Sequence, residues 1–246
     1  MRMWLVLIAI WWVLPCAAKV ERVVGSHSIW PPYFISEELG LGTEIVKAAF
    51  AQNRVDFVFQ PAPFSRAMRL LDSGEIDLIA ALWRTPARDV NYLFSDPYID
   101  NELVFVSQPK LAWQYQSLQS LSGHSLCTIR GFGYQMLLDE IPDLTTMTLL
   151  DLSACMFQVS HGRVDGLIGD KVAVNYAIHE DPHYQTLQIH SPNIVTWPVH
   201  IGVLKTHPDA KAIITTFNQG LAKIRANGEY QTILARYAGS LQPVHP

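Results

Sequence analysis

The stretch SGEIDLIAALW (residues 73–83) determines how the rest of the chain is interpreted. Gly74 is suited to end a helix, and the apolar run 78–82 that follows indicates a buried strand. A second stretch, HGRVDGLIGDK (161–171), repeats the order of glycine, charged residue, β-branched residue and aspartate before an apolar strand, 88 residues later. The repeat predicts two halves of similar construction, although chance reuse of a common helix stop and strand start is an alternative.

Strand and helix signals alternate around both stretches. In the first half we expect strands over 22–26, 55–59 and 77–82, with helices capped by Thr43 and Ser65. In the second half we expect strands over 125–129, 146–149 and 164–168, and helices over 134–139, from Asp151 to 159 and from about Asp170. Alternating strands and helices imply a parallel α/β sheet in each half.

Two further segments complete the pattern. The β-rich segments 102–107 and 194–204 are expected to cross between the halves. A helix with apolar residues at helical spacing over 210–224 follows, and a short helix runs to Tyr237.

Length and composition limit the classes of function. The chain has 246 residues, of which 49% are apolar, which is enough for one large domain or two small lobes. The net charge of −4 is too small to suggest a nucleic-acid partner, so we expect none.

The N-terminus has the pattern of a secretory signal peptide. Arg2 precedes an apolar run over 3–14, and Pro15-Cys16-Ala17-Ala18 follows, so we expect residues 1–18 to be removed. The run is too short to span a bilayer. A lipid anchor on Cys16 is the alternative, which Pro15 disfavours.

Removal of the signal would leave Cys127 and Cys155 as the cysteines of an exported protein. Two cysteines in an oxidising compartment favour a disulfide, with two separate buried thiols as the alternative.

Arg88 occupies a position that local rules disfavour. Thr85 is a good N-cap and Pro86 a good first helical residue, so Arg88 falls in the first turn, where a cation opposes the helix dipole. A bound anion would resolve this conflict, because arginine can grip a carboxylate with two hydrogen bonds. The alternatives are a salt bridge to Asp89 or Asp96, or a solvated side chain.

Ligands of parallel α/β sheets bind beyond the carboxyl ends of the strands. Arg88 follows such a strand in the first half, and Asp170 follows one in the second. The sequence therefore predicts a cleft with Arg88 on one wall and Asp170 on the other, although Asp170 is also explained as a plain N-cap.

Several motifs together resemble one family. The segments IWPPYF (29–34), FSRAMRLLDSGEIDLI (64–79), TPAR (85–88), FSDPY (94–98), GRVDGLIGD (162–170) and IRANGEYQTILARY (224–237) are similar in order and spacing to bacterial extracytoplasmic solute-binding proteins of the polar-amino-acid type. The resemblance implies a two-lobed periplasmic-binding-protein fold of type II, with a mostly parallel sheet flanked by helices in each lobe and two hinge strands. We expect residues 19–104 and 198–246 in lobe 1, and 105–197 in lobe 2.

The resemblance also implies a ligand site. Arg88 would grip the ligand α-carboxylate, Asp170 would receive the α-ammonium, and Tyr33 would pack against the ligand. The chain departs from the family at Trp83 and at Phe132-Gly133, where small hydrogen-bonding residues are common. We expect these residues to line a narrower and more apolar pocket.

Other residues are weaker candidates. Trp30 stands beside two prolines that stiffen its loop, and Arg66 lies in the first turn of a helix, so both are further candidates for ligand binding. His179 and His183 have metal-like spacing, but Pro182 interrupts any helix between them, so no metal site is expected.

The combined expectation is a periplasmic binding protein, not an enzyme, that captures a small zwitterionic or carboxylate ligand for an ABC permease. It would be a monomer and need no cofactor. One alternative is a periplasmic cyclohexadienyl or prephenate-type dehydratase on the same fold, favoured by the aromatic residues Trp83 and Phe132. Another is a sensor or adaptor that passes a ligand signal to a membrane partner.

Overall fold

The computed structural model describes residues 20–241, so the expected signal peptide lies outside the described residues. The elements, in chain order, are β1 (Arg22–His27), α1 (Leu41–Ala51), β2 (Asp56–Pro61), α2 (Phe64–Asp72), β3 (Leu78–Trp83), α3 (Pro86–Asp89), β4 (Tyr92–Phe94), β5 (Ile99–Ser107), η1 (Leu118–Leu121), β6 (Ser125–Ile129), α4 (Gln135–Leu138), β7 (Thr145–Leu149), α5 (Leu152–Ser160), β8 (Gly166–Asp170), α6 (Lys171–Glu180), η2 (Pro182–Tyr184), β9 (Gln188–Ile189), β10 (Val195–Leu204), α7 (Ala210–Ala226), α8 (Glu229–Arg236) and α9 (Ala238–Leu241).

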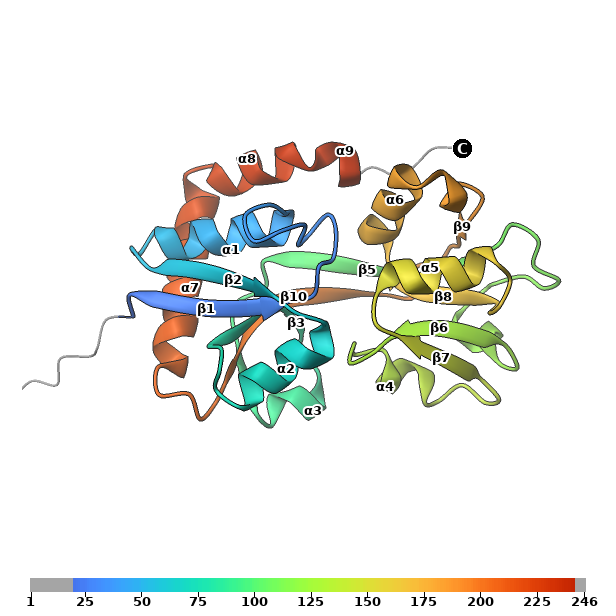
Figure 1. The fold of residues 1–246 in the computed structure, drawn as a ribbon, viewed down its shortest axis with the longest axis horizontal. Coiled ribbons are helices and arrows are strands. Elements are labelled where there is room, and N and C mark those ends of the chain that lie inside the picture. Colours follow the sequence, from blue (N-terminus) through green and yellow to red (C-terminus); the bar gives the residue numbers. More distant parts are fainter. Residues whose placement is uncertain (1–19, 242–246) are drawn as a thin grey trace, which may run out of the picture.

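The strands form two mostly parallel groups that two long strands connect. Strands β1, β2 and β3 pair in parallel, and so do β6, β7 and β8. The path through the sheet is β2-β1-β3-β10-β5-β8-β6-β7, in which β10 and β5 pair antiparallel with each other and with their neighbours. Figure 1 shows the two groups of strands side by side, each with its own helices. The two-lobed α/β fold is therefore confirmed.

Strands β5 and β10 run through both lobes. Strand β10 pairs with β3 near Val199 and with β5 from Val195 onward, whereas β5 pairs with β8 along Leu103–Ser107. These strands contain the crossing segments expected from the sequence. We propose that the lobe boundaries fall within them, at 104/105 and 197/198.

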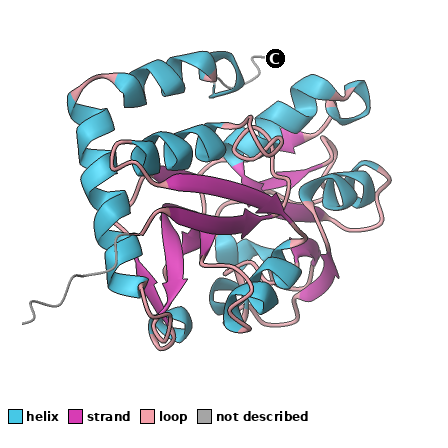
Figure 2. Cartoon of the chain, turned by 60° about the vertical axis from the view of Figure 1, so that its left-hand side comes forward, coloured by secondary structure: helices cyan, strands magenta, loops and turns pink. Residues whose placement is uncertain are grey.

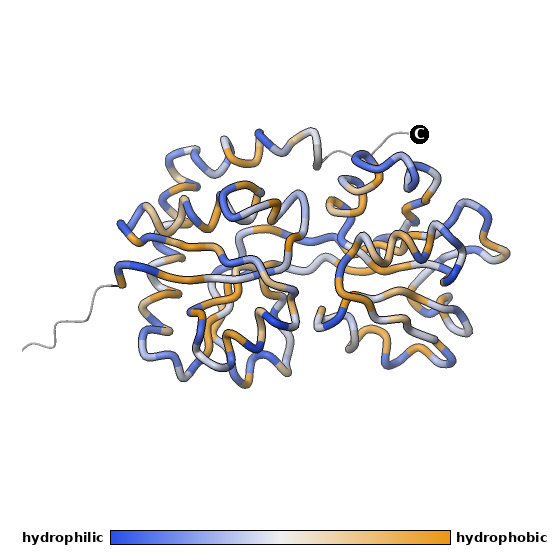
Figure 3. Tube along the Cα trace, viewed as in Figure 1, coloured by the Kyte–Doolittle hydropathy of each residue, from blue (hydrophilic) through white to orange (hydrophobic). Residues whose placement is uncertain are grey.

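The core follows the apolar strands. All six residues of β3 and all five residues of β8 are buried. Helices surround the strands on more than one side (Figure 2), and apolar residues concentrate along the strands of both lobes (Figure 3). Helices α1 and α7 pack so closely that a Cβ atom added at Gly220 would lie 1.7 Å from the carbonyl oxygen of Ala49. At the C-terminal end, α9 contacts α6 of the other lobe (Figure 1).

Three predicted helix caps are confirmed. The side chains of Thr85, Asp151 and Asp170 accept backbone N–H hydrogen bonds at the starts of α3, α5 and α6. Asp151, for example, accepts one from Ala154 at 2.8 Å. Each cap precedes its helix directly, so a local sequence signal is enough to find it.

Two predicted caps are wrong. Helix α1 begins at Leu41, after Gly40, and α2 begins at Phe64, after Pro63, so neither Thr43 nor Ser65 is a cap. Gly40 has a φ of 131°, and a Cβ atom there would lie 2.4 Å from the carbonyl oxygen of Tyr33. The close approach of the Tyr33 loop therefore requires glycine and turns the chain into the helix early.

Candidate functional site

Arg88 is held between the two lobes by hydrogen bonds to carbonyl oxygens. Its guanidinium donates to the oxygen of Trp83 at 2.8 Å and, across the cleft, to that of Gly131 at 2.9 Å. Loss of hydration lowers the pKa of Arg88 to about 10. Asp89 pairs instead with Arg84 at 2.7 Å, and within residues 20–241 no carboxylate is paired with Arg88. Among the described residues, Arg88 is thus a partly buried cation whose hydrogen-bond acceptors are neutral.

A small cavity of about 10 Å³ adjoins Arg88. Its lining combines one charged residue with aromatic rings and a small residue: His27, Trp30, Phe64, Ala81, Trp83, Arg88 and Phe132. The structure therefore brings together four of the residues singled out in the sequence, namely Trp30, Trp83, Arg88 and Phe132. His27 and Phe64 were missed, because nothing local distinguishes them from core residues.

Phe132 fills the space between the lobes. Its ring meets those of Trp30, Phe64 and Trp83 edge-on, with centroid distances of 5.8, 5.1 and 5.3 Å. Gly133 beside it packs against lobe 1, since a Cβ atom there would lie 3.4 Å from Trp83 and from Thr85. The loop therefore closes the cleft in this arrangement.

Asp170 lies deeper than expected. It is only 3% exposed, and neither this small cavity nor the larger one described below is lined by it. Its Oδ1 accepts hydrogen bonds from the Ala173 N–H at 2.9 Å and the Tyr33 hydroxyl at 3.0 Å. Its Oδ2 has no hydrogen-bond partner among the described residues. Burial raises the pKa of Asp170 to about 7, although the neighbouring hydrogen-bonding groups of Ala173, Tyr33, Val172 and Asn101 lower it.

Of the two aromatic residues expected at the ligand, only Trp30 is at the small cavity. Tyr33 is 2% exposed and faces Asp170, whereas Trp30 lines the cavity. Asn101 of β5 was missed in the sequence: its Oδ1 accepts from Trp83 Nε1 at 2.8 Å, and its Nδ2 has no partner in the described part of the chain. Asn101 lies between Asp100 and Glu102, just before the predicted crossing segment 102–107, so no local signal set it apart.

A larger cavity of about 440 Å³ shares Trp30 and Phe132 with the small one. It lies between the 28–31 loop and the helices α5 and α6, and its lining includes the carboxylates of Asp151, Glu180 and Asp181. Among the described residues that line it, none is arginine or lysine. Arg66 is exposed and lines neither cavity.

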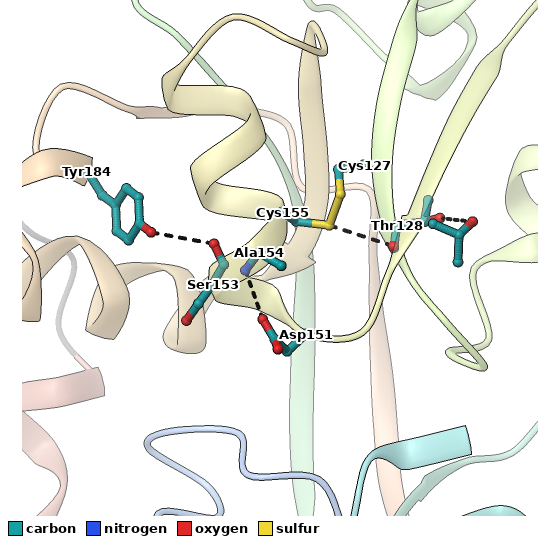
Figure 4. Close-up of a disulfide and its surroundings, with 8 residues drawn as sticks. Cys127, Thr128, Asp151, Ser153, Ala154, Cys155 and Tyr184 are labelled. Carbon is teal, nitrogen blue, oxygen red and sulfur yellow. Dashed lines mark hydrogen bonds between the residues drawn. A yellow bond between two sulfur atoms is a disulfide. The ribbon is translucent and has the colours of Figure 1, made fainter. Parts of the chain in front are cut away.

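The predicted disulfide is present. Cys127 of β6 and Cys155 of α5 are joined, with their Cα atoms 5.4 Å apart. Figure 4 shows the bridge near Asp151, Ser153 and Tyr184, all of which line the larger cavity. The bridge therefore links β6, the strand that precedes the loop Gly131-Phe132-Gly133, to one wall of that cavity.

The described residues contain no group of three His, Cys, Asp or Glu side chains placed to hold a metal ion. His183 pairs with its neighbour Asp181 at 2.8 Å. Within residues 20–241, no helix has the length and apolar character needed to cross a bilayer.

A family model for bacterial extracellular solute-binding proteins, family 3, matches residues 23–240. The chain belongs to this family. It is 26% identical to ABC transporter arginine-binding protein 1 of Escherichia coli, over 88% of the chain and 90% of that protein. It is 23% identical to the arginine-binding periplasmic protein of Mannheimia haemolytica, over 90% and 93%. Among solved structures, an ancestral arginine-binding protein bound to arginine has a TM-score of 0.78 at 22% identity, over 88% of this chain and 98% of that one.

Proposed function

We propose that this family member captures a small carboxylate-bearing solute between its lobes in the periplasm and delivers it to an ABC permease. The observation that carries the proposal is Arg88, a partly buried cation at the cleft that lacks a paired carboxylate within the described residues. A carboxylate would supply the negative charge that two neutral carbonyl oxygens do not.

Asp170 supports an amino-acid-like ligand. Its Oδ2, which forms no hydrogen bond within the described residues, can accept one from an ammonium group once the lobes separate enough for a ligand to reach it. The named relatives bind arginine, and the larger cavity carries the carboxylates of Asp151, Glu180 and Asp181, which suit a cationic group. A zwitterion with its carboxylate on Arg88 is therefore the first class to test.

The test is isothermal calorimetry of the purified protein against the common L-amino acids and simple carboxylates. Arg88→Ala should weaken binding by ~2–5 kcal/mol, because a desolvated charge contact is lost. Arg84→Ala is the matched control: Arg84 is exposed, pairs with Asp89 and lines neither cavity. Unchanged affinity in Arg88→Ala would reject the site, and a panel without any binder would reject the function.

We propose binding in place of catalysis. The family that matches the chain and the named relatives are solute-binding proteins, which supports binding as the function. Incubation with prephenate should leave it unchanged, and appearance of an aromatic product would overturn this part of the proposal. Periplasmic fractionation and light scattering should find an exported monomer with its first 18 residues removed.

A further inference from the structure

The loop Gly131-Phe132-Gly133, here called the 131–133 loop, inserts from lobe 2 into lobe 1. The oxygen of Gly131 accepts a hydrogen bond from Arg88 at 2.9 Å. A Cβ atom at Gly131 would lie 3.2 Å from the Phe64 ring, so its backbone lies directly against lobe 1. The loop thus occupies the place that the proposed function assigns to a ligand.

The Phe132 ring, which is partly exposed, packs against an aromatic cage, defined as His27, Trp30, Phe64 and Trp83. Its plane makes angles of 75°, 72° and 80° with the rings of Trp30, Phe64 and Trp83. These are edge-to-face contacts, the arrangement that aromatic pairs prefer. The cavity that remains, about 10 Å³, holds at most about one water molecule. The cage is therefore filled by one aromatic ring.

The two contacts of the loop are joined by a short covalent path. The carbonyl carbon of Gly131 is separated from the ring of Phe132 by the nitrogen, Cα and Cβ of Phe132. A free molecule with a carboxylate and an aromatic ring two or three atoms apart has nearly the same reach. Its carboxylate would accept hydrogen bonds from Arg88 and also carry a negative charge, whereas the Gly131 oxygen that Arg88 contacts in this structure is neutral.

We propose that the 131–133 loop is an internal stand-in for the ligand, and that the ligand is an aromatic carboxylate. The carboxylate binds Arg88, and the ring enters the aromatic cage in place of Phe132. The larger cavity already borders Phe132, so it provides space for the displaced side chain. This inference rests on the proposed function and names the ligand class of the same site.

Calorimetry with matched compounds tests the class. L-phenylalanine and L-tryptophan carry ring, carboxylate and ammonium, while 3-phenylpropionate and 4-phenylbutyrate lack the ammonium. L-alanine, L-arginine and propionate lack the ring, and 2-phenylethylamine lacks the carboxylate. We expect Arg88-dependent binding of aromatic carboxylates and at least about tenfold weaker binding of the others, since one missing anchor costs about that factor. Comparison of the two aromatic amino acids with the two aromatic acids that lack the ammonium group shows whether the ligand is a zwitterion or a simple acid.

Replacement of Phe132 tests whether its side chain occupies the place of the ligand ring. In Phe132→Ala the side chain that occupies the aromatic cage is removed, so a larger fraction of the protein molecules can accept a ligand. Aromatic carboxylates should therefore bind about tenfold tighter. Phe132→Leu, which keeps an apolar side chain, should have an intermediate effect. Phe157→Ala is the matched control, because Phe157 is 42% exposed on α5 and lines neither cavity.

The outcomes separate the two proposals. Tighter binding in Phe132→Ala and unchanged binding in Phe157→Ala support the inference. Weaker binding in both folded Phe132 variants overturns it, because Phe132 would then be part of the ligand's own site. If L-arginine or L-alanine binds through Arg88 more tightly than every aromatic carboxylate, the inference fails while the proposed function stands. If nothing in either panel binds, both fail.

Discussion

The hydroxyl of Tyr33 donates a 3.0 Å hydrogen bond to Oδ1 of Asp170, which joins the loop after β1 to the start of α6. Both side chains are nearly inaccessible to solvent, at 2% and 3% exposure. A buried contact between lobe 1 and lobe 2 therefore uses the same carboxylate that caps a helix of lobe 2.

Tyr33→Phe should lower the free energy of unfolding by ~1–2 kcal/mol, because it leaves a buried carboxyl group with one fewer hydrogen bond. The same change should raise the pKa of Asp170 further, since the Tyr33 hydrogen bond lowers it. Urea unfolding measures the first effect. Tyr176→Phe is the control, because the Tyr176 hydroxyl has no hydrogen bond to another described residue; an equal loss in both variants would contradict the assignment.

The pH dependence of stability should change in Asp170→Asn. Burial raises the pKa of Asp170 to about 7 from 3.8, so between these values the folded protein holds a proton that the unfolded chain releases. Protonation of Asp170 therefore stabilises the folded protein at low pH, and this stabilisation is lost as the pH rises through 7. Asparagine remains an N-cap but does not titrate.

The quantity to measure is the unfolding free energy of Asp170→Asn minus that of the wild type. It should increase between pH 4 and 7, by up to about 1.4 kcal/mol per pH unit. Taking the difference matters because burial lowers the pKa of His27 to about 4, which gives the opposite slope from pH 4 to 6.5 in both proteins. A difference independent of pH would show that Asp170 is ionised in the folded protein.

Loss of the Cys127–Cys155 bridge should lower stability by ~2–4 kcal/mol, because the unfolded chain gains freedom over a loop closed across 28 residues. Guanidinium unfolding of Cys127→Ala/Cys155→Ala, compared with the wild type, measures this loss. Reductant should destabilise the wild type and leave the double variant unchanged. Equal sensitivity of both proteins to reductant would argue against the bridge.

Gly220→Ala should destabilise the protein by ~1–3 kcal/mol, because the new methyl group would overlap the backbone of Ala49 and force α1 and α7 apart. Thermal unfolding gives the comparison with Gly239→Ala in α9, where an added Cβ atom meets nothing within 4 Å. The control should be neutral or slightly stabilised, since alanine favours helices. Similar melting temperatures for both variants would show that α1 and α7 adjust without cost.

Local signals were enough for much of the fold. The strand predicted over 77–82 and the caps Thr85 and Asp170 depend on residues within a few positions; the strand is found one residue later, over 78–83, and both caps are confirmed. The start of α1 was misplaced because glycine is required at position 40 by the close approach of the Tyr33 carbonyl oxygen, a contact that no local pattern contains.

The site was only partly predictable for the same reason. Arg88 could be found because its place in a first turn is unfavourable on sequence grounds alone. Whether Trp30 or Tyr33 faces the cavity depends on how the loop packs between the lobes. Asn101 and the larger cavity depend on which residues of β5 and α6 the two lobes bring together, and so required the structure.

The described residues include four tryptophans, and three of them lie at the proposed site or stack on a residue that lines it. Trp30 and Trp83 line the small cavity, and Trp83 stacks on Trp197 with ring centroids 5.2 Å apart and planes inclined by 16°. Indole emission depends on the polarity and contacts of its surroundings. Movement of Phe132 away from these rings would alter their fluorescence, so the molecule carries its own optical reporter of occupancy and needs no attached dye.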